Sequence, residues 1–315
     1  MGCGVPGSWI MIKGFAITPP VLGRISIGHL IENAQGKRLP KKDDQFTLTS
    51  QVQTREGWVV HPLDQVLRQA QPDQKLRAIP VRVLFNDPDL SLRAEYTLFD
   101  RQTARPVCTG DGQECRRMSP EGLKTLPCPG PSLCEFGKGG LCKVYGRLNV
   151  SVNTEQDSDD LGSFIFRTTG YNSIRTLAAR LRYFQAVSGD LLSCMNLVLR
   201  LRGKSTTQSY RTPIFYVDLT LPDGVSLEDA ILQAKVRHES RQEVGFDQVA
   251  LDKAARLGFA NAWFEETEED IPALLTEFCP EDSALEVAAA SAPAAADSAN
   301  PPLKQKLAER ISATH

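Results

Sequence analysis

Five cysteines lie close together near the middle of the chain, in a segment rich in glycine and proline. Turns formed by glycine and proline allow several thiolates to approach one ion, and zinc favours four such ligands in a tetrahedron. These residue types therefore predict one zinc ion held by Cys108, Cys128, Cys134 and Cys142. The spacing contains no paired Cys-x-x-Cys motif, so an iron–sulfur cluster or reduced cysteines without a metal remain alternatives. Cys115 is a fifth candidate ligand.

The predicted metal site is structural rather than catalytic. A catalytic zinc usually has histidine or carboxylate ligands and an open position for water, but no histidine lies between His61 and His238. Residues 105–143 also lack the apolar periodicity needed to build a core unaided, so a bound ion would order them. Lys143 or Arg116 could offset the negative charge of the thiolates.

A basic stretch follows the cysteines, and an acidic stretch follows the basic one. Residues 162–213 contain eight basic residues and one acidic residue, whereas residues 218–286 contain seventeen acidic and five basic residues. Guanidinium groups and aromatic rings suit phosphates and stacked bases, and arginines also receive acidic protein partners. The candidate nucleic-acid or partner-binding residues are Arg167, Tyr171, Arg175, Arg182, Arg200, Arg202, Lys204 and Arg211.

No catalytic motif accompanies these two features. The sequence contains no His-Glu-x-x-His, no Gly-x-Ser-x-Gly and no phosphate-binding loop. Its paired acids, such as Asp43-Asp44 and Asp159-Asp160, fall in turns or charged runs. The residues therefore give no positive case for an enzyme. A metal-dependent hydrolase or nuclease acting on nucleic acid is one alternative function, and an interaction protein without DNA affinity is another.

Composition indicates a globular protein of the cytoplasm. The 315 residues are 41% hydrophobic and 23% charged, enough for a core of ordinary size. No apolar stretch approaches the ~18 to 20 residues of a membrane span, and residues 1–10 do not resemble a secretory signal. Crowded cysteines without an export signal favour intracellular metal binding over disulfides. The oligomeric state is not predicted.

Hydrophobic patterning predicts short strands before the cysteines, with one helix among them. Residues 80–85 and 92–99 are expected to pair across the Asn86-Asp87-Pro88 turn, and His61 is expected to begin the helix. Residues 105–143 are predicted to be irregular. The other expected strands are 14–17, 23–27 and 46–51, and the helix is expected to reach residue 69.

The second half is expected to alternate strands and helices. Asn172 or Ser173 should cap a helix reaching residue 187, and Ser226 should begin another reaching residue 243. A third helix is predicted at 248–257, and the strands are predicted at 145–152, 163–167, 197–202 and 213–221.

Together these elements predict an α+β fold with a mixed or antiparallel sheet, packed helices, a metal-stapled cysteine insertion and a disordered acidic tail. The predicted divisions are 1–11 extension, 12–104 mainly β region, 105–143 cysteine insertion, 144–221 α+β core, 222–280 acidic helical region and 281–315 mostly disordered tail.

Three segments resemble the phage Gp3-like family: Gly14–Gly28, Cys142–Leu148 and Thr169–Arg175, the last followed by a helix and Leu199-Arg200. The resemblance covers about residues 12–221. That family includes recombination directionality factors of large serine integrases and relatives on integrative elements labelled hydrolase or metal-binding protein. The resemblance implies an accessory factor that binds a serine integrase or other recombination protein, and directs synapsis from integration toward excision. Cys115 and the acidic tail depart from the phage pattern.

Overall fold

The computed structural model describes residues 20–32, 38–54, 57–100, 103, 105–153, 162–205, 207 and 213–261. All of these residues belong to one compact unit. None of the helices among them is both long enough and apolar enough to cross a membrane. The predicted strand at 14–17, Arg211 and the predicted tail at 281–315 lie outside the described residues.

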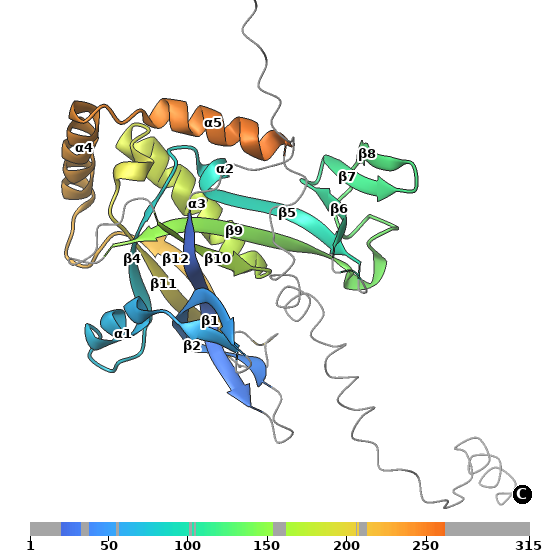
Figure 1. Cartoon of the computed structure of the whole chain (residues 1–315), viewed down its shortest axis with the longest axis horizontal. Coiled ribbons are helices and arrows are strands. Elements are labelled where there is room, and N and C mark those ends of the chain that lie inside the picture. Colours follow the sequence, from blue (N-terminus) through green and yellow to red (C-terminus); the bar gives the residue numbers. More distant parts are fainter. Residues whose placement is uncertain are drawn as a thin grey trace, which may run out of the picture. The chain divides into compact units, whose positions relative to one another are not determined.

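A mixed sheet of twelve strands forms the scaffold of the described residues, as the α+β prediction required (Figure 1). Nine strands follow one another in the order β3-β2-β1-β10-β9-β5-β6-β7-β8, and β4, β11 and β12 branch from this path through β9. The β1–β10 pair is parallel and the other pairs are antiparallel. The strands are β1 (Val21–Glu32), β2 (Arg38–Thr54), β3 (Gly57–Val60), β4 (Ala78–Val83), β5 (Leu92–Phe99), β6 (Pro106–Gly110), β7 (Glu114–Ser119), β8 (Gly122–Pro127), β9 (Cys142–Val152), β10 (Ser163–Thr168), β11 (Leu197–Lys204) and β12 (Ile214–Thr220).

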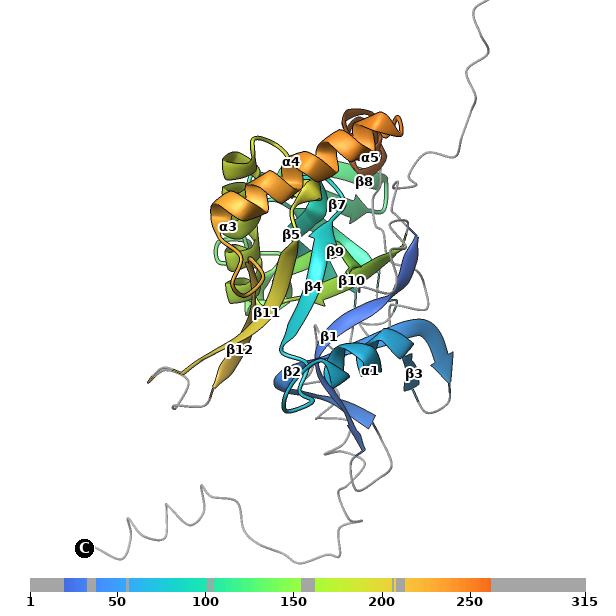
Figure 2. The same ribbon diagram turned by 90° about the vertical axis from the view of Figure 1, so that its left-hand side faces the viewer.

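Five α-helices accompany the sheet within the described residues. The longest, α3, buries Leu177, Leu181 and Phe184 at helical spacing, as the sequence predicts, and these join the main core. Helix α4 contacts α3 and α5 contacts α2, both away from β1–β3, whereas α1 lies beside β2 (Figures 1 and 2). The helices are α1 (Pro62–Gln69), α2 (Pro88–Ser91), α3 (Tyr171–Ser188), α4 (Leu227–Glu243) and α5 (Gln248–Asn261).

The predicted helix starts are confirmed in two cases and shifted in one. The His61 side chain accepts the Leu63 N–H at the start of α1, and the Ser226 side chain accepts the Asp229 N–H at the start of α4. The cap of α3 is Gly170 instead of Asn172 or Ser173. Ser173 is buried inside the helix, where its hydroxyl accepts the Val217 N–H of β12 at 3.1 Å. Its polar group therefore connects the helix to the sheet.

The predicted pairing of residues 80–85 with 92–99 is wrong. Val83 at the end of β4 lies opposite Val150, and Leu92 at the start of β5 lies opposite Leu148, so both strands pair in line with β9. The Asp87 side chain accepts the Asp89 N–H, and this cap together with Pro88 at the first helical position forms α2 where the sequence predicts a turn.

The prediction that residues 105–143 are irregular is also wrong. The segment contains β6, β7 and β8, which extend the main sheet from the edge of β5. In Figure 1 the β7–β8 hairpin stands at the end of the sheet farthest from α4. The segment contains few apolar residues, so its sequence lacks the alternation typical of strands. Its backbone is instead held by strand pairing that continues an existing sheet.

Candidate functional site

The candidate metal-binding residues lie in residues 105–143, named here the cysteine module. Leu98 of β5 lies opposite Cys108 of β6 on one side and opposite Cys142 of β9 on the other. Gly110 of β6 lies opposite Cys115 of β7. Directly opposed residues share a face of a sheet, as do residues two positions apart in one strand. The register therefore places Cys108, Cys115 and Cys142 on one face.

The remaining two cysteines approach this face from the chain that follows β8. A Cβ atom added at Gly110 would lie 3.0 Å from Cys128 Sγ, so this sulfur lies directly above the strand. Cys134 Sγ accepts a hydrogen bond from Arg117 Nη2 at 3.9 Å, and Arg117 lies opposite Cys108. The structure therefore brings together all five cysteines that the sequence singles out, and each is a free thiol.

Two glycines allow this close approach. A Cβ at Gly110 would lie 2.7 Å from Cys115 Cβ and 2.9 Å from the Glu114 carbonyl oxygen. A Cβ at Gly137 would lie 2.7 Å from Cys142 Cβ. All three distances are shorter than real Cβ atoms show. Gly110 and Gly137 are therefore required for packing around the sulfurs.

Two of the thiols, those of Cys142 and Cys115, are held in an environment that opposes negative charge. Burial raises the pKa of Cys142 to about 11, with further increases from the sulfurs of Cys108, Cys128, Cys134 and Cys115, in that order. Burial also raises the pKa of Cys115 to about 11, assisted by its hydrogen bond with Cys108. Several thiolates at this face would therefore need a compensating cation.

Arg117 supplies one such positive charge, and the sequence prediction missed it. Burial disfavours the charged guanidinium, but its hydrogen bond with Cys108 and the nearby sulfurs outweigh burial and raise the pKa of Arg117. Its guanidinium also lies 4.2 Å from the centre of the Phe136 ring. Strand alternation could have indicated this position, because Cys115 and Arg117 share one face of β7. Arg116, one of the two basic residues suggested by the sequence, points to the other face, where it donates to the Ala260 carbonyl oxygen.

The sulfurs do not form a coordination shell as they stand. Among the side chains that the structure describes, no three from His, Cys, Asp or Glu are placed to hold a metal ion. Convergence of the cysteines is thus observed, and the zinc ion stays a prediction.

Carboxylates from other segments pair with several residues of the predicted basic surface. Asp218, with 8% of its side chain exposed, holds Arg180 Nε at 3.0 Å and Arg202 Nε at 3.5 Å. Arg182 Nη2 lies 3.1 Å from Asp89 Oδ1, and Arg200 pairs with Asp223. The basic stretch therefore carries less unpaired charge than its composition indicates.

The other predicted binding residues are spread over three elements. Tyr171 and Arg175 are exposed one turn apart at the start of α3, and Arg167 is partly buried in β10. Lys204 Nζ donates to Asn172 Oδ1 at 2.9 Å, which joins the end of β11 to the start of α3. Arg211 lies outside the described residues, so the structure gives no test of its role.

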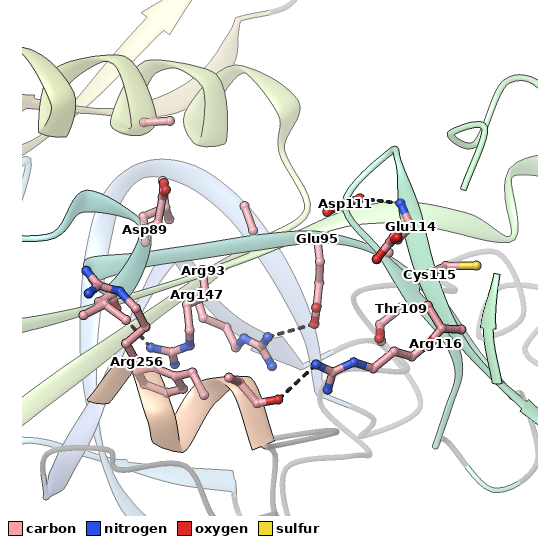
Figure 3. Close-up of a pocket in the computed structure, with 18 of the residues that line it drawn as sticks. Asp89, Arg93, Glu95, Thr109, Asp111, Glu114, Cys115, Arg116, Arg147 and Arg256 are labelled. Atoms are coloured by element: carbon pink, nitrogen blue, oxygen red, sulfur yellow. Dashed lines mark hydrogen bonds and ion pairs between the residues drawn. The ribbon is translucent and has the colours of Figure 1, made fainter. Parts of the chain in front are cut away.

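A cavity of about 720 Å³ lies between the strands leading into the cysteine module and α5 (Figure 3). Arg147, only 4% exposed, pairs with Glu95 across β9 and β5 at 2.9 Å. The lining of the cavity carries both signs of charge. The charged residues are Arg93, Arg116, Arg147, Arg182, Arg256, Asp89, Glu95, Asp111 and Glu114. No sequence motif marks this cavity, because its residues come from segments far apart in the chain.

The comparison with protein families matches residues 22–222 to the Gp3-like family, described as recombination directionality factor-like. Comparison with curated proteins and with solved structures gave no match. The matched residues form well over half of the chain, and they run from the start of β1 to just beyond β12. The resemblance predicted from three short segments is confirmed over the whole sheet, including the cysteine module. The chain belongs to the Gp3-like family of recombination directionality factor-like proteins.

Proposed function

We propose that the protein is a recombination directionality factor that binds a large serine integrase of a phage or integrative element and shifts recombination from integration toward excision. The observation that carries this proposal is the family match over residues 22–222. The match includes all twelve strands and the cysteine module, so the entire scaffold is the part shared with the family.

The cysteine module carries a surface suited to a protein partner. Leu133 is 77% exposed, and Phe136 and Leu141 are exposed on the same loop, between β8 and β9. Large apolar side chains gathered at a surface indicate an interaction site more often than isolated ones do. We assign the integrase contact to these three residues, named here the apolar loop.

The ion pairs of the basic stretch favour protein contact over phosphate contact as its main interaction. Arginines that release counterions from DNA must be available to phosphates, whereas Arg180, Arg182, Arg200 and Arg202 each have a carboxylate partner. Their pairing does not prevent weak DNA contact, because Tyr171 and Arg175 are exposed together at the start of α3.

The test is a recombination assay with the serine integrase encoded by the same genetic element. We expect the protein to promote recombination between the two hybrid attachment sites and to inhibit recombination between the original pair. Stoichiometric amounts should be needed, because the protein acts by binding and not by turnover. If neither direction changes and no complex with the integrase forms, the proposal is wrong.

A matched pair of variants tests the apolar loop. Leu133→Asp should strongly reduce both effects, since charge would replace the apolar contact. Leu232→Asp is the control, because this residue of α4 is also exposed, at 59%, and lies beyond the family match. Equal loss in both variants would remove the apolar loop as the contact site.

DNA contact is a second candidate activity, carried by Tyr171 and Arg175. Retention of double-stranded DNA should weaken with added salt and in the Arg175→Glu variant. The same mixtures, supplemented with magnesium or manganese, test the hydrolase alternative. Cleavage of the DNA would favour that alternative over a directionality factor.

A further inference from the structure

We infer that the cysteine module binds one zinc ion through the thiolates of Cys108, Cys128, Cys134 and Cys142, with Cys115 as a hydrogen-bonding neighbour of the site. This inference goes beyond integrase binding, and it has a readout of its own in the metal content. It begins from three cysteines on one face of the sheet formed by β9, β5, β6 and β7, with Cys128 and Cys134 approaching the same face from the chain after β8.

Cys115 is distinguished from the other four by its contacts. It is 2% exposed, lies on the inner part of β7, and its thiol donates to the Pro127 carbonyl oxygen at 3.8 Å. A sulfur that is buried and directed at a backbone carbonyl is less available to a shared ion than one that is partly exposed. Cys128, Cys134 and Cys142 are only partly buried, and Cys108 lies two positions from Gly110, above which the Cys128 sulfur lies.

The four proposed ligands come from the sheet and from the chain that joins β8 to β9. Cys108 and Cys142 are fixed by strand pairing to β5. Cys134 lies in the connection between β8 and β9, where the Cys134 N–H donates to the Gly130 carbonyl oxygen. Among the described residues the sulfurs do not form a complete metal site. Zinc binding would therefore require the sulfurs on this connection to shift toward Cys108 and Cys142.

The surroundings fit a zinc–tetrathiolate centre. Leu98, Val107 and Leu126 pack around the cysteines and exclude water from one side. Four thiolates and one zinc ion carry two net negative charges, and the guanidinium of Arg117 lies beside the Cys134 sulfur to offset part of this charge. The absence of side chains at Gly110 and Gly137 leaves room for the sulfurs.

The first experiment measures metal in the full-length protein, purified with a tag that contains no histidine. Mass spectrometry under native conditions and elemental analysis should give about one zinc per chain. Cobalt added in place of zinc should produce the visible bands of a tetrahedral thiolate site. Iron with visible absorbance, or no metal after anaerobic addition of zinc, would overturn the inference.

Single substitutions test the ligand set. The zinc content should fall strongly in each of the variants Cys108→Ser, Cys128→Ser, Cys134→Ser and Cys142→Ser. The Cys115→Ser variant should retain about one zinc per chain. Circular dichroism of each variant checks that the sheet is intact. Retention of zinc by Cys134→Ser together with its loss from Cys115→Ser would overturn the proposed ligand set.

Two neighbouring arginines provide a matched test of the charge argument. Arg117→Gln should weaken zinc affinity about 10- to 100-fold, measured by competition with a chelator of known affinity. Arg116→Gln makes the same change on the opposite face of β7 and should leave zinc affinity unaltered. Equal affinities in the two variants would show that Arg117 does not support the site.

Discussion

Gly110 shows how strongly one residue constrains the cysteine module. A methyl group there would lie within 3.0 Å of three groups, including a backbone oxygen that cannot move freely. We expect Gly110→Ala to lower the free energy of unfolding by about 1–3 kcal/mol, measured by urea denaturation. Gly203→Ala is the control, because the nearest atom to its Cβ would be a Phe215 ring carbon at an ordinary 3.4 Å. Equal loss in both variants would contradict the packing argument.

Asp218 is the residue that most directly limits the charge available on the basic stretch. Asp218→Asn keeps its shape but removes its attraction for Arg180 and Arg202. Both arginines are half exposed, so we expect a loss of about 1 kcal/mol in the free energy of unfolding. Retention on a DNA column should also increase, because two guanidinium groups become available.

The comparison for this variant is Glu239→Gln, which removes the same charge from an exposed carboxylate of α4. Its stability should not change measurably. If both variants increase DNA retention equally, net charge and not the release of Arg180 and Arg202 would explain the effect.

At the scale of elements, Asp44 connects β2 to the chain that enters β4. Hydrogen bonds from Arg77 at 2.6 Å and Lys75 at 2.9 Å lower the pKa of Asp44 to about 2, from an ordinary value of 3.8. A lowered pKa means that the folded state favours the carboxylate. The stabilisation is therefore present above pH 3.8 and is lost as the pH falls toward about 2.

The measurement is acid unfolding of the natural protein and of Asp44→Asn. Subtracting the two curves cancels the other carboxylates, and the difference should decrease between pH 4 and pH 2. A flat difference across this interval would mean that the Asp44 ion pairs do not stabilise the connection between β2 and β4.

The same scale explains which elements the sequence could predict. Helix α3 has a long apolar stripe with Leu177 and Leu181 fully buried, so the spacing of its apolar residues was enough to predict the helix. The strands of the cysteine module were missed because β7 and β8 expose Met118 and Leu123 and bury few apolar residues. Their position depends on pairing with β5, a partner outside the segment. The convergence of the cysteines was predictable from residue type. The role of Arg117 could be predicted only once residues 114–119 were known to form a strand.

At the scale of the whole molecule, charge is divided unequally along the chain. Residues 262–315 contain eleven acidic and three basic residues, so residues 1–261 contain 27 acidic and 33 basic residues. Residues 1–261 therefore carry a net positive charge and residues 262–315 a net negative charge. We predict that the acidic residues compete with DNA or an acidic partner for the same arginines. The exposed Arg175 on α3 is one site for such competition.

Neutralising three acids in the full-length chain tests this competition without removing any segment. Glu265→Gln, Glu266→Gln and Glu268→Gln together should strengthen salt-sensitive DNA binding, because fewer carboxylates compete for the arginines. The control changes three exposed acids of α4, Glu228, Glu239 and Glu243, to glutamine, which alters net charge by the same amount. Direct competition requires the first variant to bind DNA more tightly than the second at each salt concentration. Equal gains would assign the effect to net charge, and the acidic part would then have no specific role in covering the basic stretch.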